Sequence, residues 1–268
     1  MTPMSIEEIR QVQMAMLDEI DRVCADHGLH YLLAYGTCIG AMRHKGFIPW
    51  DDDVDIMMPR EDYEVMAENF ERWTNAATYE VAWYKNGKSS SPYVKIRDNS
   101  TYVKEQFIRE DECGGIWVDV FPIDREPEDR GQVYRRFWKA RHYREMALSD
   151  PKNATSMVAK VVKNVVYPLT RNLDPFKYAK ALDENIRDCP KKDNGGLAQM
   201  VHMDNEFDAH VYYPTNLFEA MRVPFEDRSY LVPVAYDEVL TNAFGDWRTP
   251  PDEGNRIMHA SYVYRIDR

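Results

Sequence analysis

Four carboxylates occupy five consecutive positions of this chain, in the run Asp51-Asp52-Asp53-Val54-Asp55. Like charges this close raise one another's pKa and destabilise the fold unless a cation lies among them. A ligand set made of oxygen atoms suits a hard divalent ion such as Mg²⁺ or Mn²⁺. The run therefore predicts a metal site. The alternative is a solvated acidic turn, but the apolar neighbours Trp50 and Ile56 argue against full exposure.

The apolar residues that interrupt and follow this run predict that it enters a buried strand. Side chains two positions apart in a strand point to the same face. The predicted metal ligands on that shared face are Asp51, Asp53 and Asp55. Asp52 is expected to point the other way and to lie outside the ligand set.

Asp119 lies inside the apolar segment Gly115-Ile116-Trp117-Val118-Asp119-Val120-Phe121, which predicts another strand. A buried aspartate without a partner is costly. The simplest partner is the metal already predicted, and the carboxylate would serve as a further ligand or as the base that takes a proton from a substrate hydroxyl. The sequence leaves these two roles open.

Residues 31–35 predict a short buried strand that Gly36 and Thr37 close, and residues 38–44 predict a helix. Backbone N–H groups at such a helix N-terminus favour a bound phosphate. Three basic residues lie at the end of this helix, Arg43, His44 and Lys45. They could pair with phosphate oxygens, although a solvated basic turn is the alternative.

Two further cations, Lys95 and Arg97, share one face of the strand predicted at residues 92–97 and could reach a phosphate. Exposed strand cations are common, so a structural role stays open. His202 and Asp204 are expected to be structural. Aromatic rings that could contact a cationic group are abundant, and the composition does not choose among Trp50, Trp83, Tyr84, Trp117 and Trp247.

The remaining periodicity predicts a mixed α/β (α+β) fold. Ser5 and Glu8 form a capping box that begins a helix ending near residue 26. Further helices are expected over residues 59–73 and 236–244. Strands are expected at 79–84, 92–97, 101–107, 115–121, 197–203, 221–225 and 230–232, and helices between 128 and 188 with breaks at 150–151 and 174–175. This order predicts a catalytic core at 1–126, a helical insertion at 127–190 and a C-terminal segment at 191–268 that packs on the core, with a single domain as the alternative.

The 268 residues have a hydrophobic fraction of 44% and a net charge of -11, which is typical of a soluble protein and makes binding to nucleic acid unfavourable. The four cysteines show no metal-ligand spacing. The sequence shows neither a secretory signal nor a spanning segment, so a cytoplasmic location is expected. Residues 152–171 combine an apolar stripe with a basic fringe, which suits peripheral contact with a membrane or an ordinary packed helix.

A strand, Gly36-Thr37, a helix, a strand with Asp53-Val54-Asp55 and a later strand with Asp119 together resemble the polymerase-β-like nucleotidyltransferase fold. More specifically, residues 35–56, from Tyr-Gly-Thr-Cys to Asp-Val-Asp-Ile, resemble the signature of the LicD family. Residues 59–63 and 244–247, together with Pro250-Pro251, are also similar to that family. The resemblance extends from about residue 5 to 255.

Bacterial members of the LicD family transfer phosphocholine from CDP-choline onto glycans, and fukutin-related members transfer ribitol phosphate from CDP-ribitol. The resemblance implies a CDP-alcohol donor, with CDP-choline favoured, and as acceptor a sugar hydroxyl of a glycan such as a teichoic acid or lipopolysaccharide precursor. It implies catalysis by Asp53, Asp55 and Asp119, with Mg²⁺ (or Mn²⁺) held by these three and Asp51. Donor contacts would come from Gly36, Thr37, Arg43, His44, Lys45, Trp50, Lys95 and Arg97.

Two other functions fit parts of this pattern. A nucleotidyltransferase that acts on a small molecule or protein would use the same carboxylates. A Ca²⁺-binding or glycan-binding module without catalysis is less suitable, because an EF-hand loop spreads its oxygen ligands over twelve positions around a central glycine.

Overall fold

The computed structural model describes residues 1–104, 114–148, 170, 172–252, 254 and 262–267. The chain begins with β1 (Thr2–Pro3) and α1 (Ile6–His27). The predicted capping box is confirmed, because the Ser5 and Glu8 side chains each bond to the other residue's backbone N–H. Gly28 ends the helix in the left-handed conformation, with φ 68°, which glycine adopts without strain.

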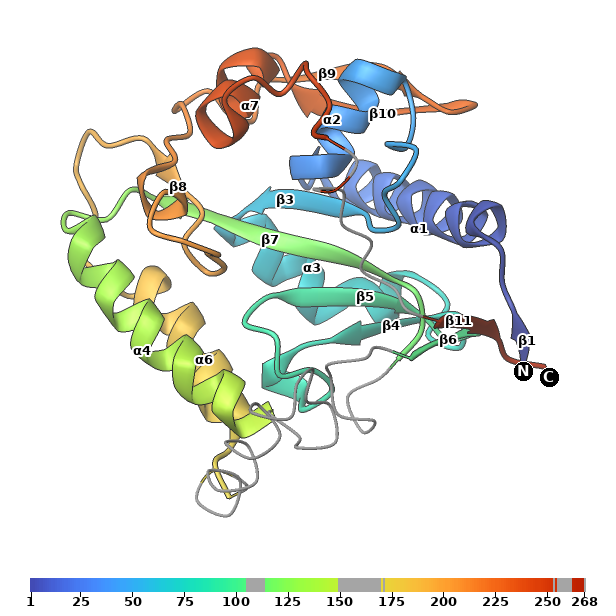
Figure 1. Cartoon of the computed structure of the whole chain (residues 1–268), viewed down its shortest axis with the longest axis horizontal. Helices are drawn as coiled ribbons and strands as arrows, with labels where there is room; N and C mark the ends of the chain where they lie inside the picture. The colour runs from blue at the N-terminus through green and yellow to red at the C-terminus, as the bar shows by residue number, and fades with distance from the viewer. Residues whose placement is uncertain (105–113, 149–169, 171, 253, 255–261, 268) are drawn as a thin grey trace.

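A six-stranded mixed sheet forms the centre of the molecule, with strand order β2-β3-β7-β5-β4 and β8 paired to β7 (Figure 1). Its strands are β2 (Leu32–Leu33), β3 (Asp55–Pro59), β4 (Tyr79–Ala82), β5 (Val94–Asp98), β7 (Trp117–Arg125) and β8 (Leu197–Ala198). β3 and β7 run parallel, and the other neighbouring pairs run antiparallel. The predicted mixed α/β architecture is thereby confirmed.

One face of this sheet is apolar and packs on helices. Ile56, Val118 and Val120 are fully buried in the main hydrophobic core, together with apolar residues of α1 and of α3 (Arg60–Trp73). Because side chains alternate along a strand, the residues between them, including Asp55 and Asp119, point to the other face. The apolar pattern of β3 and β7 thus determines which face carries the carboxylates.

The structure corrects the predicted position of Gly36 and Thr37. β2 ends at Leu33 and α2 spans Tyr35–His44, so both residues lie in the first helical turn and not in a turn before it. The helix begins early because the Thr37 hydroxyl accepts a hydrogen bond from the Asp55 backbone N–H at 2.9 Å, which joins α2 to the start of β3. Tyr35 takes a positive φ of 42° at this junction, an uncommon conformation for a residue other than glycine.

The acidic run is also less regular than its pattern predicts. β3 begins only at Asp55, so strand alternation does not apply to Asp51 and Asp53. The physical reason is that side chains of α1, described below, take the backbone carbonyls of this loop as hydrogen-bond acceptors. Asp52 is buried, while Asp51, Asp53 and Asp55 are partly exposed. Asp52 and Asp53 line the same small hollow, so the separation of Asp52 from the other three carboxylates stays a prediction.

Two antiparallel helices, α4 (Arg130–Leu148) and α6 (Pro175–Arg187), lie together at one end of the sheet (Figure 1). The predicted break at 174–175 is confirmed, since Asp174 caps α6 and Pro175 is its first residue. The basic amphipathic stretch predicted at 152–171 lies, apart from Thr170, outside the described residues.

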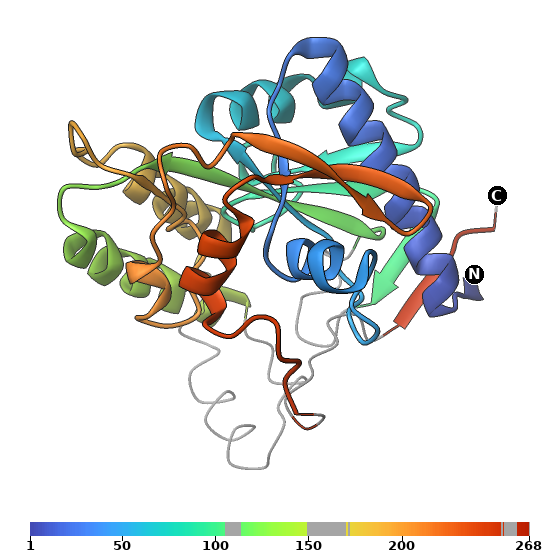
Figure 2. The same cartoon turned by 90° about the horizontal axis from the view of Figure 1, so that it is seen from above.

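The C-terminal part adds a hairpin of β9 (Ala220–Phe225) and β10 (Arg228–Pro233), followed by α7 (Tyr236–Phe244), close to the predicted bounds. The hairpin contacts β2 and α2, and α7 contacts β10 (Figure 2). The strand predicted at 197–203 is shortened to β8, because residues 199–203 turn away from the ladder and bury Met200, Val201 and Met203 against α4 and α6.

A second sheet joins the two ends of the chain. It has the order β1-β11-β6, where β6 is Thr101–Lys104 and β11 is Tyr262–Arg265. Single 3₁₀ turns at Tyr84–Asn86 and Asp208–His210 complete the described elements. The division into a core, a helical insertion and a C-terminal segment stays a prediction.

Candidate active site

A row of charged side chains crosses the three central strands of the main sheet. In the parallel pair of β3 and β7, Asp55 lies opposite Asp119, and in the antiparallel pair of β7 and β5, Lys95 lies opposite Asp119. Side chains opposite one another in a ladder project from the same face. Strand register therefore brings together three of the residues predicted from the sequence, although they are up to 64 positions apart.

Lys95 and Asp119 form a buried ion pair at the centre of this row. The Lys95 Nζ lies 3.1 Å from the Asp119 Oδ1, and both side chains are about one-tenth exposed. The contact meets the distance of an ion pair but not the geometry of a hydrogen bond, because Oδ1 has no hydrogen-bond partner. Trp117 completes the arrangement: its indole Nε1 donates to Asp119 Oδ2 at 3.1 Å, and Lys95 Nζ lies 4.1 Å from its ring centroid.

Asp55 lies in a strongly unfavourable environment for a negative charge. Burial raises the pKa of its carboxyl well above the usual 3.8, and the charges of Asp53, Asp119 and Asp51 raise it further, while Lys95 acts in the opposite direction. The charges of Asp51, Asp53 and Asp119 therefore act on the carboxyl of Asp55, the fourth predicted metal ligand. The site is therefore an oxygen-rich cluster with one lysine beside it.

Two residues of α1 hold the acidic loop in place, and the sequence reasoning did not single them out as functional. Arg10 Nη2 donates to the carbonyls of Ile48, Pro49 and Asp51 at 2.9–3.2 Å. Gln13 Nε2 donates to the Asp52 carbonyl at 2.8 Å, and its side chain is almost completely buried. Gln13 lies in the apolar stripe of its helix, where a buried glutamine requires a hydrogen-bond partner. This position is the sequence feature that indicates a positioning role for Gln13.

The start of α2 lies directly against the cluster. A Cβ at position 36 would meet Asp51 Oδ2 at 2.8 Å, so glycine allows this carboxylate to approach the helix. Thr37 is buried and holds the Asp55 backbone, as described above. The structure therefore brings Gly36 and Thr37 to the carboxylates, while their contact with a diphosphate stays a prediction.

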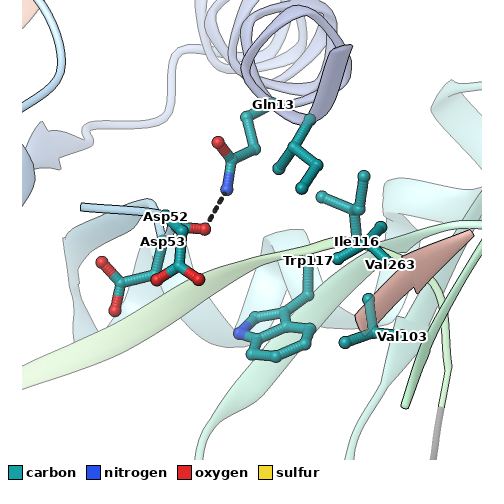
Figure 3. Close-up of a pocket in the computed structure, with 8 residues that line it drawn as sticks. Gln13, Asp52, Asp53, Val103, Ile116, Trp117 and Val263 are labelled. Atoms are coloured by element: carbon teal, nitrogen blue, oxygen red, sulfur yellow. Dashed lines mark hydrogen bonds between the residues drawn. The ribbon is translucent and has the colours of Figure 1, made fainter. Parts of the chain in front are cut away.

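A small hollow lies beside Asp52 and Asp53, between α1 and the strands that carry Val103 and Val263 (Figure 3). Its walls are mostly apolar, and Trp117 and Gln13 reach it from β7 and α1. Trp117 thus links the hollow to Asp119, because its indole lines the first and bonds to the second.

The basic residues predicted to bind phosphate lie at the other end of α2 from Gly36. Arg43 donates to the Trp247 carbonyl at 2.8 Å and to His44 Nε2 at 2.9 Å, while Lys45 is exposed and ends the helix with φ 58°. The His44 ring stands edge-on to Trp50 at 6.4 Å between centroids. A ten-residue helix is about 15 Å long, so the structure does not group these side chains with the start of α2.

Arg97 is buried two residues along β5 from Lys95, and its guanidinium serves structural partners. It donates to the Lys88 carbonyl at 3.2 Å and lies 3.7 Å from Glu80. His202 Nε2 lies 3.7 Å from the exposed Asp204. The centroid of the His202 ring lies 5.6 Å from that of Tyr93.

The structure distinguishes the aromatic candidates. Trp117 lies at the carboxylates, and Tyr93 is 5.9 Å from Lys95 Nζ and 4.4 Å from Phe121 between ring centroids. Trp83 packs in the core against Tyr63, and Trp247 packs against Tyr236. An aromatic wall of Trp117, Tyr93 and Phe121 therefore lies beside the charged row. Neither Tyr93 nor Phe121 was selected from the sequence.

The donor set fits a hard divalent ion by its chemistry. It offers carboxylate oxygens alone, and the buried Asp119 Oδ1 lacks a hydrogen bond. Among the residues that the structure describes, however, no three acidic, histidine or cysteine side chains converge as a preformed metal site. Asp119 is turned toward Lys95 and Trp117, so the full ligand set would assemble only if this carboxylate changed its partner.

Comparison with known proteins is consistent with this geometry. Residues 28–156 match the family model described as the nucleotidyltransferase domain of LicD, FKTN and FKRP. The chain is 28% identical over 280 aligned positions to a protein of Haemophilus influenzae named lipopolysaccharide cholinephosphotransferase LicD, and the alignment covers 98% of this chain and 99% of that protein. An uncharacterized protein of Rickettsia prowazekii is 31% identical over 71 residues, 25% of this chain and 27% of its own. Within the described residues, no helix is long and apolar enough to cross a membrane.

Proposed function

This chain belongs to the LicD family of phosphotransferases, and we propose that it transfers phosphocholine, or a similar substituted phosphate, from a CDP-alcohol to a sugar hydroxyl of a cell-surface glycan. CDP-choline is the favoured donor, and a lipopolysaccharide or teichoic acid precursor is the favoured acceptor. The similarity to a cholinephosphotransferase over nearly the whole chain supports this choice. The observation that carries the proposal is the row of Asp55, Asp119 and Lys95 beside the start of α2.

In the proposed reaction, the acceptor oxygen attacks the phosphorus that bears the choline. The bond from that phosphorus to the bridging oxygen breaks, CMP leaves, and the proton of the hydroxyl passes to a carboxylate of the cluster. Little covalent chemistry is required of a protein in such a transfer, which depends on positioning and on neutralising charge. A polymerase-β-like nucleotidyltransferase core would supply the strand arrangement for this task.

Asp51, Asp53, Asp55 and Asp119 would hold Mg²⁺, which neutralises diphosphate charge when bound. Thr37 keeps the Asp55 backbone fixed, and Arg10 and Gln13 fix the loop that carries the other carboxylates. Lys95 lies 3.1 Å from Asp119 and would contact the donor's phosphates. The strand ladder fixes the backbone positions of Asp55, Asp119 and Lys95, and the side chains of Asp119 and Lys95 are buried, so the sheet positions these groups for the transfer.

The aromatic wall supports a cationic headgroup. A quaternary ammonium is attracted to aromatic faces within about 6 Å of the ring centroid. The Lys95 ammonium lies 4.1 Å from the Trp117 ring centroid and 5.9 Å from that of Tyr93, which supports the proposal that a positive headgroup binds here. Ribitol and glycerol carry no such charge, so the wall favours choline among the CDP-alcohols.

The test is to incubate the protein and a glycan acceptor with CDP-choline, CDP-ribitol or CDP-glycerol and to measure CMP, with and without Mg²⁺. We expect CMP release from CDP-choline that requires Mg²⁺ and that Asp53→Asn lowers by at least about 100-fold. Pyrophosphate and a nucleotide-labelled acceptor, formed from a nucleoside triphosphate, would instead identify a nucleotidyltransferase. Binding of metal or glycan with no turnover of any donor would identify a non-catalytic module.

A further inference from the structure

The contact between Lys95 and Asp119 has the properties of a temporary pair. Lys95 Nζ lies within ion-pair distance of Asp119 Oδ1, yet this oxygen receives no hydrogen bond. A buried carboxylate is ordinarily satisfied by hydrogen bonds as well as by charge. The ammonium therefore neutralises the charge of Asp119 but leaves its Oδ1 without a hydrogen bond.

The surroundings allow the ammonium to move while the strands stay fixed. The backbones of β5 and β7 are held by their ladder at the register of Lys95 and Asp119. The lysine side chain is a flexible four-carbon stem that ends in a compact charge. Trp117 contacts both groups, so it offers the ammonium an aromatic face when the ion pair loosens and still donates to Asp119 Oδ2.

We propose that Lys95 is a built-in counter-ion that competes with the divalent cation for Asp119 and yields that place when the donor's phosphates attract its ammonium. This inference rests on the metal site of the proposed function. It explains why the carboxylates lie near one another while no three of the described acidic side chains converge. While the Lys95 ammonium lies beside Asp119, it repels a divalent cation that approaches the same carboxylate.

The consequence is coupling between metal and donor. A donor phosphate that draws Lys95 away frees Asp119 for the cation, and a bound cation in turn frees Lys95 for the phosphate. Such coupling is reciprocal, and its usual size is about 5–150-fold in affinity. The free enzyme should therefore bind a divalent cation weakly, which limits metal loading until donor is present.

The experiment measures Mn²⁺ binding alone, by the electron paramagnetic resonance signal of free Mn²⁺, with neither donor nor acceptor present. The variants are Lys95→Met, which removes the charge, and Lys95→Gln, which removes the charge but can still donate a hydrogen bond to Asp119. Lys85→Met is the matched control, because Lys85 also combines a carboxylate partner, Glu64 at 2.5 Å, with an aromatic face, Trp83 at 3.9 Å, away from the charged row.

We expect Mn²⁺ to bind about tenfold more tightly to both Lys95 variants than to the wild type and the Lys85 variant. Equal or weaker binding in both Lys95 variants overturns the proposal. The proposal is also overturned if the Lys95 variants fail to fold and millimolar Mn²⁺ does not restore folding. A cation able to replace Lys95 at Asp119 must compensate for the lost ammonium. The result is independent of the transfer reaction, since a protein that releases no CMP from any CDP-alcohol can still show or lack this difference.

Discussion

Arg60 should contribute strongly to the stability of the framework around the site, because it pairs with two buried carboxylates. It is the first residue of α3, directly after β3. Its guanidinium donates two hydrogen bonds, of 3.0 and 2.6 Å, to the carboxylate of Asp124 in β7. Its Nη1 also donates to Asp183 of α6 at 2.7 Å. The Arg60 side chain is 11% exposed, that of Asp124 4% and that of Asp183 0%. Arg60 therefore ties the two carboxylate strands to the helical pair.

Arg60→Met should lower the free energy of unfolding by about 3–5 kcal/mol, because it leaves the buried Asp124 without its cation and removes one of the two arginines that pair with Asp183. Some of the loss is moderated at Asp183, which keeps hydrogen bonds from Tyr84 and Arg187. For a chain of this size each kcal/mol corresponds to about 2–4 °C in Tm, so a fall of roughly 6–20 °C is expected.

The assay is urea unfolding followed by circular dichroism, with thermal unfolding alongside. Arg22→Met is the control, since Arg22 also pairs with two carboxylates, Glu19 and Asp26, but its side chain is 46% exposed. A surface pair of this kind contributes about 1 kcal/mol or less. If Arg60→Met loses no more stability than Arg22→Met, the reasoning about the buried network is wrong.

Three further predictions concern the site itself. Without metal, the free energy of unfolding of Asp55→Asn should rise relative to the wild type as the pH rises above 3.8, by up to about 1.4 kcal/mol per pH unit. The reason is that the folded state holds the Asp55 proton more tightly than the unfolded state does. A difference that stays constant across a pH series of unfolding curves refutes this. Gly40→Ala should cost about 1–3 kcal/mol, since the added Cβ would lie 2.5 Å from the Gly46 carbonyl oxygen, whereas Gly254→Ala, with open space around it, should leave the urea midpoint unchanged. Gln13→Leu should lower stability by about 1–3 kcal/mol and slow CMP release, because the acidic loop loses its hydrogen bond from α1; an unchanged rate would show that this bond does not position the carboxylates.

The residues of the candidate site were predictable because their side chains are unfavourable in an apolar setting without a partner. Asp119 inside an apolar strand and the carboxylates of the acidic run both demanded a partner, and the structure places Asp55 opposite Asp119. α7 and the β9–β10 hairpin were predicted nearly to the residue, because periodicity and turn residues agree there. Local patterns of this kind determine local structure.

What the sequence did not reveal depends on contacts between distant segments. The pairing of Lys95 with Asp119 follows from strand register, which no local pattern specifies. The early start of α2 depends on the hydrogen bond from Asp55 to Thr37, and the irregular acidic loop depends on Arg10 and Gln13 of α1. Tyr93 and Phe121 look like ordinary core residues until the sheet sets them beside Lys95.

Two aspartates of the same strand offer the most direct test of the claim that the charged row performs phosphocholine transfer. Asp119 and Asp124 are both buried in β7, but the first belongs to the row and the second to the Arg60 network. CMP release from CDP-choline should be compared for Asp119→Asn and Asp124→Asn at a temperature where circular dichroism shows both to be folded. The account predicts a loss of at least about 100-fold for Asp119→Asn and less than about tenfold for Asp124→Asn. Near wild-type turnover in Asp119→Asn would contradict it.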